Sequence, residues 1–381
     1  MTSEERREAR YRRRVAKRVA KKAKACASYD NFDEVFSYDH LYKSYRKCRR
    51  NVAWKASVQK YITQAPLLVQ QTYERLQQGK WRSSGFFEFD LHERGKLRHI
   101  RSVTIGERVV QRCLCDYALV PMLGRTFVYD NAASLQYKGY HFAVRRLCQH
   151  LREHYHKHGT EGYILLFDFR KFFDNVSHRV CKDILREEFT DKRVIAITEH
   201  FIDMFGDRGL GLGSQISQTF ALVSANRIDH YVKDVCGIRG YGRYMDDGYV
   251  IHESKDRLKQ ILDGIRQICA ELEITLNENK TQIVKLSHGF TYLKARIYLT
   301  NTGKVLRKIP KVSVTRERRK LKKLVRPYEE GKLTYQDIYM SWQSWKAYAQ
   351  NFSAWHTIQS IGKLYDQLFI LPWVHGHPAA V

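Results

Sequence analysis

The sequence predicts an α+β protein in which a small split βαβ sheet carries helices on one face. The first observation is the order of patterns in the middle of the chain, which runs strand, helix, helix, hairpin, helix, strand. The second is the segment from Thr315 onward, which has helical spacing and many basic residues. The third is that no internal repeat or low-complexity linker divides the 381 residues, a length that suffices for about two or three packed subdomains.

Charge and composition limit the classes of protein that fit. Lys and Arg number 67 against 40 Asp and Glu, a formal net charge of +27, which predicts a polyanionic partner, most simply nucleic acid. Hydrophobic residues make up 43% and aromatic residues 13%, which indicates a globular chain. No apolar run reaches membrane-spanning length and the N-terminus has no signal-peptide core, so we expect a cytoplasmic protein with no membrane partner.

The cysteines and histidines do not predict a metal centre or a disulfide framework. The eight cysteines are scattered without a C-x-x-C pair, which indicates buried free thiols in a reducing compartment. Histidines gather at His150, His154, His156 and His158, where metal ligation is one interpretation. The surrounding stretch is more typical of the frayed end of a surface helix.

The N-terminal third of the chain is basic at first and then mostly helical. Residues 1–25 hold eleven Lys and Arg and three Glu, and form either a basic helix that stiffens on RNA or a solvated tail. Apolar spacing predicts helices within 39–80, and short strands joined by a HERG turn follow within 81–105. Helical spacing returns at 107–123 and 141–156.

The central segment carries the predicted sheet. GYILLFDF reads as a buried strand that ends in Asp168, and YGRYMDDGYVI (241–251) reads as a hairpin. Between them, Ser177 is expected to cap one helix, and Ser217 is expected to cap a long helix after a Gly-rich loop. A helix over 255–272 and the strand-like runs TQIVKL and GFTYLKARIYL complete the order.

Three carboxylates stand out in this order of elements. Asp168 lies at the end of one strand, and Asp246 and Asp247 lie side by side at a hairpin tip. Neighbouring strands would bring them together, and each would raise the pKa of the others unless cations neutralise them. Two Mg²⁺ ions, with Mn²⁺ as a substitute, suit such oxygen ligands and would support attack of a 3′-hydroxyl with pyrophosphate leaving. A lone Asp-Asp pair is more often a solvated turn, but the apolar flanks and the Asp168 strand argue against that interpretation.

These motifs resemble those of reverse transcriptases. YMDD (244–247) resembles their Y-x-D-D box, and FDFRKFFDN (167–175) resembles their first palm motif, with Asp168 as its metal aspartate. In that family the backbone carbonyl after this aspartate, here that of Phe169, also touches metal. The resemblance covers most of the chain and implies a right-hand polymerase. The implied parts are a basic N-terminal extension over 1–38, fingers over 39–160, a palm over 161–300 and a helical, basic thumb over 301–381.

The same resemblance assigns residues that would hold the incoming nucleotide. Phe173 occupies the steric-gate position, where a ring leaves no room for a 2′-hydroxyl; the alternative is a core phenylalanine. Lys96 and Arg98 in GKLRHIRS would grip the triphosphate, or else are ordinary surface charges of a hairpin. Lys280 in LNENK fits the palm lysine placed near the leaving pyrophosphate.

The loop LGSQISQ distinguishes subfamilies. Most reverse transcriptases have Q-G-x-x-x-S-P here, whereas this chain has Leu212, Gly213, Ser217 and Gln218 in an L-G-x-x-x-S-Q pattern. This pattern resembles the reverse transcriptases of diversity-generating retroelements and argues against a group II intron maturase. The usual glutamine bonds the incoming nucleotide and Leu212 does not, so the resemblance implies error-prone copying opposite template adenines.

Basic residues outside these motifs are expected to contact the template–primer duplex. Arg108 and Gln111 in ERVVQRCL resemble a segment whose residues contact template or organise the fold. The thumb residues expected to follow the duplex phosphates, or else to form a solvated charged face, are Lys311, Arg316, Arg318, Arg319, Lys322 and Lys323. Trp342, Trp345 and Trp355 are expected in the thumb core.

The resemblance therefore implies an RNA-directed DNA polymerase, encoded by a bacterium or a phage, that copies a template RNA into cDNA for a diversity-generating retroelement. Its partners would be the template RNA, the RNA/cDNA duplex, dNTPs, and an accessory protein or further copies of the chain. Two alternatives stay open. One is a reverse transcriptase of antiphage defence that makes cDNA from a non-coding RNA, and the other is a catalytically inactive, basic RNA-binding scaffold.

Overall fold

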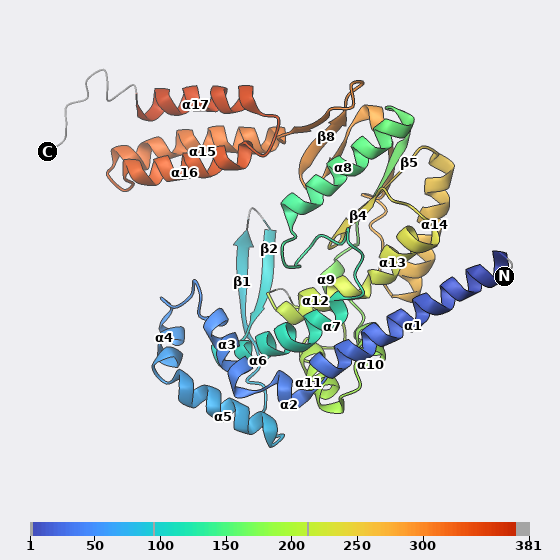
Figure 1. The fold of residues 1–381 in the computed structure, drawn as a ribbon. Coiled ribbons are helices and arrows are strands. Elements are labelled where there is room, and N and C mark those ends of the chain that lie inside the picture. Colours follow the sequence, from blue (N-terminus) through green and yellow to red (C-terminus); the bar gives the residue numbers. More distant parts are fainter. Residues whose placement is uncertain (1–2, 94–95, 212, 371–381) are drawn as a thin grey trace.

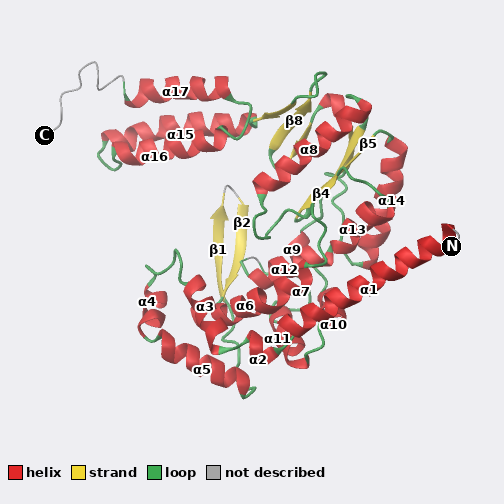
Figure 2. Ribbon diagram, viewed as in Figure 1, coloured by secondary structure: helices red, strands yellow, loops and turns green. Residues whose placement is uncertain are grey.

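The chain folds into a helical lobe with a two-stranded hairpin, a four-stranded central sheet, a small three-stranded sheet and a C-terminal helical bundle, as the computed structural model shows (Figure 1). The structure describes residues 3–93, 96–211 and 213–370. Figure 2 shows that the bundle is built from helices alone, whereas the strands gather in the rest of the molecule.

A long basic helix, α1 (Ser3–Tyr29), opens the chain, so the helical alternative for the N-terminal segment is confirmed from Ser3 onward. It runs along the lobe, and its N-terminal half projects to one side (Figure 1). Its C-terminal end is fixed, because Lys22 donates to the carbonyl of Glu187 and the Asp30 carboxylate accepts the backbone N–H of Thr190 at 2.6 Å. Neither α1 nor any other described helix is both long and apolar enough to cross a membrane.

The helical lobe packs short helices around an apolar core, and one hairpin with exposed apolar side chains projects from it. Its helices are α2 (Phe32–Val35), α3 (Tyr38–Cys48), α4 (Ala56–Thr63), α5 (Ala65–Gln77), α6 (Ile105–Leu114) and α7 (Val120–Gly124), with a π-helical turn η1 (Cys115–Leu119) between the last two. The hairpin pairs β1 (Phe87–Glu93) with β2 (Lys96–Ser102) and, in the view of Figure 1, rises from the lobe toward the bundle. These elements confirm the helices and the hairpin expected from the sequence.

The central sheet has the split βαβ topology that the sequence predicts. Its strands are β3 (Tyr163–Phe167), β4 (Tyr241–Tyr244), β5 (Asp247–His252) and β6 (Gln282–Lys285). Their order is β4-β5-β3-β6, and every neighbouring pair is antiparallel. β3 and β4 are therefore parallel, with β5 inserted between them, which is the defining feature of a split βαβ unit.

Both faces of the central sheet are covered, which corrects the expectation that helices lie on one face only. Successive residues of a strand point to opposite faces. Leu165 and Val250 share a core with α14 (Lys255–Glu271), which packs on β3 and β5. On the opposite face, Ile164 packs in a second core with α8 (Tyr140–His158) and with the strands β7 (Phe290–Tyr292) and β8 (Ala295–Leu299) of a second, smaller sheet. The second layer exists because the apolar strands after β6 fold back over the sheet.

Short helices connect β3 to β4. They are α9 (Phe172–Asn175), α10 (His178–Glu188), α11 (Lys192–Asp203), α12 (Gln215–Ser224) and α13 (Asn226–His230), followed by a π-helical turn η2 (Tyr231–Val235). Ser177 caps α10 as predicted, because its Oγ accepts the backbone N–H of Val180 at 3.5 Å.

The prediction that Ser217 caps a helix is wrong. α12 begins earlier, with Ser214 at its N-cap, because Gly213 has a φ of 102° that turns the chain ahead of the helix. Ser217 lies inside α12, fully buried, and its hydroxyl has no hydrogen-bond partner in the described part of the chain. The single long helix expected here is also divided, since Ala225 separates α12 from α13.

The histidine-rich end of α8 stays helical to His158, and two of its four histidines are buried while His156 and His158 are exposed. His150 and His154 are 3% and 8% exposed, and burial lowers the pKa of His150 to about 4. His150 Nδ1 lies 2.9 Å from the Tyr249 hydroxyl, and His154 Nε2 lies 2.6 Å from the carbonyl of Glu161. Their burial follows from contact with β4 and β5, which the helical pattern alone does not reveal.

The chain after β6 forms the small sheet and the bundle. The small sheet joins β7 (Phe290–Tyr292), β8 (Ala295–Leu299) and β9 (Val305–Lys308) in that order, after a 3₁₀ turn η3 (Leu286–His288). The bundle consists of α15 (Lys311–Glu329), α16 (Tyr335–Ala349) and α17 (Trp355–Phe369). Trp342 and Trp345 lie in its core as predicted. Trp355 does not, because α17 turns Ile361 and Tyr365 inward and leaves Trp355 67% exposed.

A buried ion pair ties β4 to α13. Arg243 donates from Nε and Nη2 to the two carboxylate oxygens of Asp229, each at 2.7 Å, and neither side chain is exposed. The Tyr241 hydroxyl donates to the same carboxylate. Breaking such a pair leaves an uncompensated buried charge, so the pair fixes the position of β4.

We expect Asp229→Ala and Arg243→Met each to lower the free energy of unfolding by about 3–5 kcal/mol, because each leaves one buried charge unpaired. The double variant should lose less than the sum of the two. Urea unfolding followed by circular dichroism measures this. Glu271→Ala, which breaks the exposed pair with Arg227, is the control and should cost about 1 kcal/mol or less. Equal losses at the two pairs would contradict the prediction.

Candidate active site

Strand pairing brings the three predicted aspartates together. The hairpin formed by β4 and β5 carries Asp246 in its turn and Asp247 at the start of β5. Asp168 follows directly after β3, whose last residue, Phe167, pairs with Gly248 of β5. The three carboxylates therefore lie at the same end of the central sheet, which is the arrangement expected from the sequence.

Packing beneath the hairpin turn holds these aspartates in place. Arg243 Nη1 donates to the carbonyl of Met245 at 2.8 Å, and its Nη2 donates to that of Leu222 at 3.0 Å. Met245 has a φ of 55°, a left-handed conformation that a non-glycine residue keeps only when its surroundings hold it. Gly248 is required next to the pair, because a side chain there would overlap the ring of Phe167.

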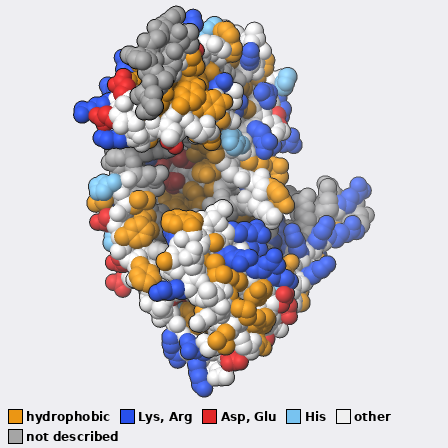
Figure 3. Space-filling model, turned by 90° about the vertical axis from the view of Figure 1, so that its left-hand side faces the viewer, with side chains coloured by type: hydrophobic (Ala, Val, Ile, Leu, Met, Phe, Trp, Pro, Cys, Tyr) orange, Lys and Arg blue, Asp and Glu red, His pale blue; other side chains and the backbone are white. Residues whose placement is uncertain are grey.

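The aspartates line a cleft of about 740 Å³. Phe173 of α9, Tyr140 of α8, Lys280 before β6 and Lys294 in the turn between β7 and β8 also line it. Figure 3 shows a hollow between the upper and lower parts of the molecule, with acidic side chains visible inside it. A cleft lined by both carboxylates and ammonium groups suits a substrate that carries phosphates together with cations.

The cleft holds an excess of negative charge near the hairpin turn. Burial, followed by the charges of Asp246 and Asp168, raises the pKa of Asp247 to about 6. Burial raises the pKa of Asp246 as well, and Asp168 adds to this shift. The ammonium group of Lys280 lowers both pKa values without cancelling the rise. Binding of a cation to carboxylates in this state is favourable, because the cation neutralises their charge.

Asp168 is bound by donors of the chain itself. Lys280 Nζ lies 3.0 Å from both of its carboxylate oxygens, and Asn277 Nδ2 donates to Oδ2 at 2.9 Å. The backbone N–H of Asn277 also donates to the Asp168 carbonyl at 2.8 Å. The hydrogen bond to Asp168 raises the pKa of Lys280 and keeps it charged. Lys280 thus lies in the cleft as expected, but in contact with an aspartate.

The chemistry of the donors fits a hard divalent cation, because such ions prefer carboxylate and carbonyl oxygens. No three Asp, Glu, His or Cys side chains of the described chain are already arranged as a metal site, since Asp168 faces Lys280 and Asn277. A cation that approaches Asp168 would meet the ammonium group of Lys280 at both carboxylate oxygens. Phe169, whose carbonyl was expected to join the ligands, is buried and forms a β-bridge with Leu276.

Phe173, the predicted steric gate, lines the same cleft as the aspartates. It is half-buried, whereas Phe172 is buried in the core. Both residues belong to the short helix α9.

The other predicted nucleotide-binding residues are Lys96, Arg98, Leu212, Gly213 and Gln218. Lys96 and Arg98 belong to β2, but their side chains lie outside the described residues, and Leu212 lies outside them altogether. Gly213 and Gln218 are exposed at the start of α12 and are absent from the described lining of the cleft.

Arg108 and Gln111 lie on α6 in different settings. The Arg108 guanidinium donates to the Ser102 hydroxyl at 3.0 Å. Gln111 is 6% exposed, and its side chain bonds Glu107 and the Ser214 hydroxyl that begins α12. Gln111 therefore joins α6 to the loop before α12, which matches the fold-organising alternative.

The predicted basic residues of the bundle are all exposed on α15, and they divide between its two flanks. Lys311, Arg316, Arg319 and Lys323 line one hollow. Arg318 and Lys322 line a different groove, which α15 forms with α17.

Sequence reasoning missed Asn277 and Arg243. Asn277 lies three residues before Lys280 in LNENK, but its contact with Asp168 depends on the tertiary fold. The buried ion pair of Arg243 could have been predicted from the sequence, because a single arginine inside an apolar strand needs a buried acidic partner.

We expect Asp247→Asn to stabilise the cation-free protein above pH 6 and to leave it unchanged below about pH 4. The folded-state pKa of Asp247 is raised from 3.8 to about 6, so the stability given by its neutral form is lost as pH rises through that value. The gain at neutral pH is on the order of 3 kcal/mol or less, at 1.36 kcal/mol per pKa unit. Urea unfolding in chelator at several pH values measures it.

Asp256→Asn serves as the control, because Asp256 is exposed and the ammonium of Lys259 lowers its pKa. That variant should show no gain above pH 6. A gain for Asp247→Asn that does not change with pH would contradict the raised pKa.

Comparison with known proteins adds to this geometry. Two similar solved structures are telomerase from Candida albicans in complex with a TWJ fragment of telomeric RNA (11% identity, TM-score 0.47) and apo telomerase from Candida tropicalis truncated from its C-terminal domain (15%, 0.45). The alignments cover 64% and 59% of this chain, which spans only 51% and 55% of those chains. No curated protein sequence matches the chain.

A family model described as reverse transcriptase (RNA-dependent DNA polymerase) matches residues 92–297, more than half of the chain. The matched segment contains β2, the central sheet, Asp168, the Asp246–Asp247 pair and Lys280. The chain therefore belongs to the reverse transcriptase family, whose fold is that of a right-hand polymerase.

Proposed function

We propose that the protein is an RNA-directed DNA polymerase that copies a template RNA into cDNA by two-metal nucleotidyl transfer. The observation that carries the proposal is the meeting of Asp168 with Asp246 and Asp247 in one cleft, where burial and the neighbouring aspartates raise the pKa of Asp246 and Asp247. Family membership supports the reaction class. The proposed parts keep the boundaries of 39–160 for fingers, 161–300 for palm and 301–381 for thumb, after the extension 1–38.

The residues that would hold the cations are Asp168, Asp246 and Asp247, with the carbonyl of Phe169. Two Mg²⁺ ions, or Mn²⁺ in their place, would activate the primer 3′-hydroxyl and stabilise the leaving pyrophosphate. The contact between Arg243 and the hairpin turn holds the backbone that carries the two hairpin aspartates. Cation binding to their carboxylates would therefore need no rearrangement of that backbone.

Other residues of the chain act on the incoming nucleotide. Lys280, once released from Asp168, carries a positive charge next to the position of the departing phosphates, where it would neutralise charge and supply a proton. Phe173 would close the space for a 2′-hydroxyl and so select deoxynucleotides. Lys96 and Arg98 on β2 would grip the triphosphate.

Basic surfaces around the cleft would hold the nucleic acid. Arg108 on α6 and the flank of α15 that carries Lys311, Arg316, Arg319 and Lys323 are proposed contacts of the template–primer duplex. A net charge of +27 supports a polyanionic partner and fast association with it. Because the carboxylates and Lys280 are all present in the cleft, a catalytically inactive scaffold is the weaker alternative.

The biological role we propose is error-prone copying in a diversity-generating retroelement, in the cytoplasm of a bacterium and encoded by it or by a phage. The L-G-x-x-x-S-Q loop with Leu212, Gly213 and Gln218 supports this role. An accessory protein or further copies of the chain would complete the complex. The second candidate is antiphage defence with a non-coding RNA template, favoured by the Gly-rich loop without proline and by the long basic helix α1.

Primer extension with purified protein, Mg²⁺, a template RNA and dNTPs tests the proposed reaction. We expect Asp246→Asn to reduce the rate at least about a thousand-fold, because the cations lose a ligand in the transition state. Asp263→Asn, an exposed residue of α14, should keep the wild-type rate. Retained binding of template–primer by Asp246→Asn would exclude misfolding. Extension by this variant at the wild-type rate would refute the assignment of the site.

Sequencing of cDNA made from a defined RNA distinguishes the two biological roles. For a retroelement enzyme we expect errors concentrated at template adenines, and Leu212→Gln should reduce them roughly two- to ten-fold, the effect of one restored hydrogen bond to the nucleotide. Leu212→Met should leave the errors unchanged. Uniform fidelity or a repetitive product in the wild type would favour the defence role.

A further inference from the structure

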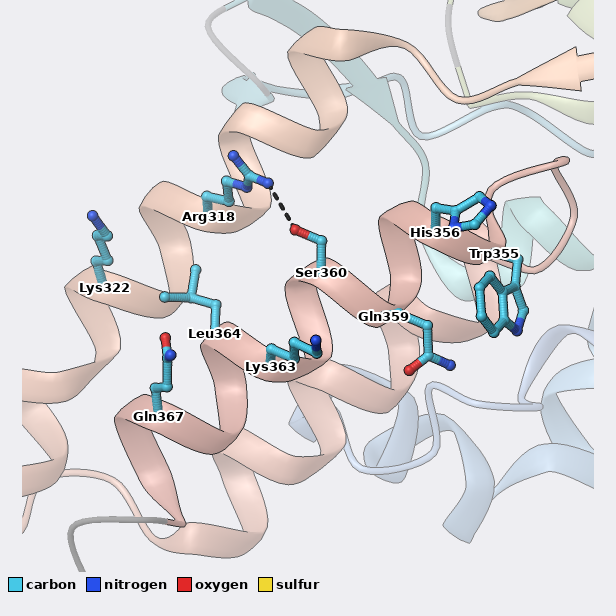
Figure 4. A pocket seen from close by; sticks show the side chains of 9 residues that line it. All are labelled: Arg318, Lys322, Trp355, His356, Gln359, Ser360, Lys363, Leu364 and Gln367. Carbon is cyan, nitrogen blue, oxygen red and sulfur yellow. Dashed lines mark hydrogen bonds between the residues drawn. The ribbon is translucent and has the colours of Figure 1, made fainter.

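The bundle has a groove that shares no described lining residue with the cleft of the aspartates. α15 and α17 enclose about 770 Å³ between them, well separated in the sequence from the aspartates. Figure 4 shows Trp355 and His356 at one end of this groove, Lys322 and Gln367 at the other, and Lys363 between them. The lining side chains come from one face of each helix and are largely exposed to solvent.

The charge of the side chains that line the groove is positive. Arg318, Lys322 and Lys363 line it, and no Asp or Glu is among its described lining residues. Arg318 Nη2 donates to the Ser360 hydroxyl across the groove at 3.0 Å, which holds the guanidinium between the two helices. Three cations without a carboxylate partner in the same groove favour an anionic occupant with spaced charges, such as a phosphate backbone.

The groove also offers a flat aromatic surface and amides. Trp355 is 67% exposed, although the other two tryptophans of the bundle are buried, and His356 lies edge-on to it with ring centroids 4.8 Å apart. Gln359 and Gln367 extend along the same face of α17, over about 18 Å from Trp355. An exposed indole next to cations and amides is the combination that binds unpaired bases by stacking.

An RNA duplex and a single strand of RNA expose different groups to such a surface. Bases of an RNA duplex are stacked on one another and present only phosphates and a shallow groove, so they leave an indole face unused. The opposite flank of α15, with Arg316, Arg319 and Lys323, has cations but no exposed tryptophan among its lining residues and suits duplex phosphates. The two flanks of α15 thus differ in the chemistry they offer.

We propose that the groove between α15 and α17 binds a single-stranded segment of RNA. A base stacks on Trp355, and Arg318, Lys322 and Lys363 contact the phosphates. The inference goes beyond the proposed polymerase activity, because binding in this groove needs neither the aspartates nor a cation. The groove gives the protein a second binding site for an RNA whose base-paired part binds at another surface of the protein.

Binding of a fluorescein-labelled single-stranded oligouridylate of about twelve nucleotides tests the proposal by anisotropy in chelator, without primer or dNTP. We expect Trp355→Ala to weaken binding by about five-fold or more, the effect of one lost stacking contact, and Trp355→Phe to restore most of it. Trp54→Ala is the control, because Trp54 is 74% exposed but lies outside the groove. Thermal unfolding of each variant verifies the fold.

A salt titration tests the phosphate contacts separately. Lys322→Gln combined with Lys363→Gln should reduce the slope of log affinity against log salt by about 1.4, at roughly 0.7 for each phosphate contact of a single strand. A blunt RNA duplex should bind the Trp355→Ala variant as tightly as the wild type. Equal effects of Trp355→Ala and Trp54→Ala, or equal losses for duplex and single strand, would overturn the proposal. Both outcomes are independent of whether the aspartates catalyse, so they leave the proposed polymerase activity unaffected.

Discussion

The pairing of β3 with β5 is the constraint on which the site depends, because it forces mutually repelling carboxylates into one cleft. Phe167 opposite Gly248 determines where Asp168 leaves the sheet, and the short hairpin determines where Asp246 and Asp247 stand. The free energy that opposes their repulsion comes from apolar packing on both faces of the sheet and from the Arg243–Asp229 pair. None of these groups needs to touch a substrate.

The distribution of charge follows from this arrangement. The chain carries +27 overall, yet burial at the end of the central sheet, together with the charges of neighbouring aspartates, raises the pKa of two carboxylates. The basic residues lie instead on surfaces such as α1 and α15. A polyanion is therefore attracted to the periphery, and its approach to the acidic cleft is favourable only with cations between them.

Local patterns in the sequence predicted much of the fold and the acidic core of the site. The strand that ends in Asp168, the hairpin around Asp246 and the helix over 255–272 each have a period that a short window reveals. Ser217 and Trp355 were misjudged, because a helix start depends on the φ of Gly213 and burial depends on which face a helix turns inward. The contacts of Asn277 and Lys280 with Asp168 arise between segments far apart in the chain, and no local pattern encodes them.

The contact between Lys280 and Asp168 gives the protein a counter-ion that is covalently part of it. The local concentration of this ammonium group at the carboxylate is set by the chain between them and does not fall when the protein is diluted. A cation from solution that approaches Asp168 would therefore compete with a tethered ammonium group whose local concentration is constant.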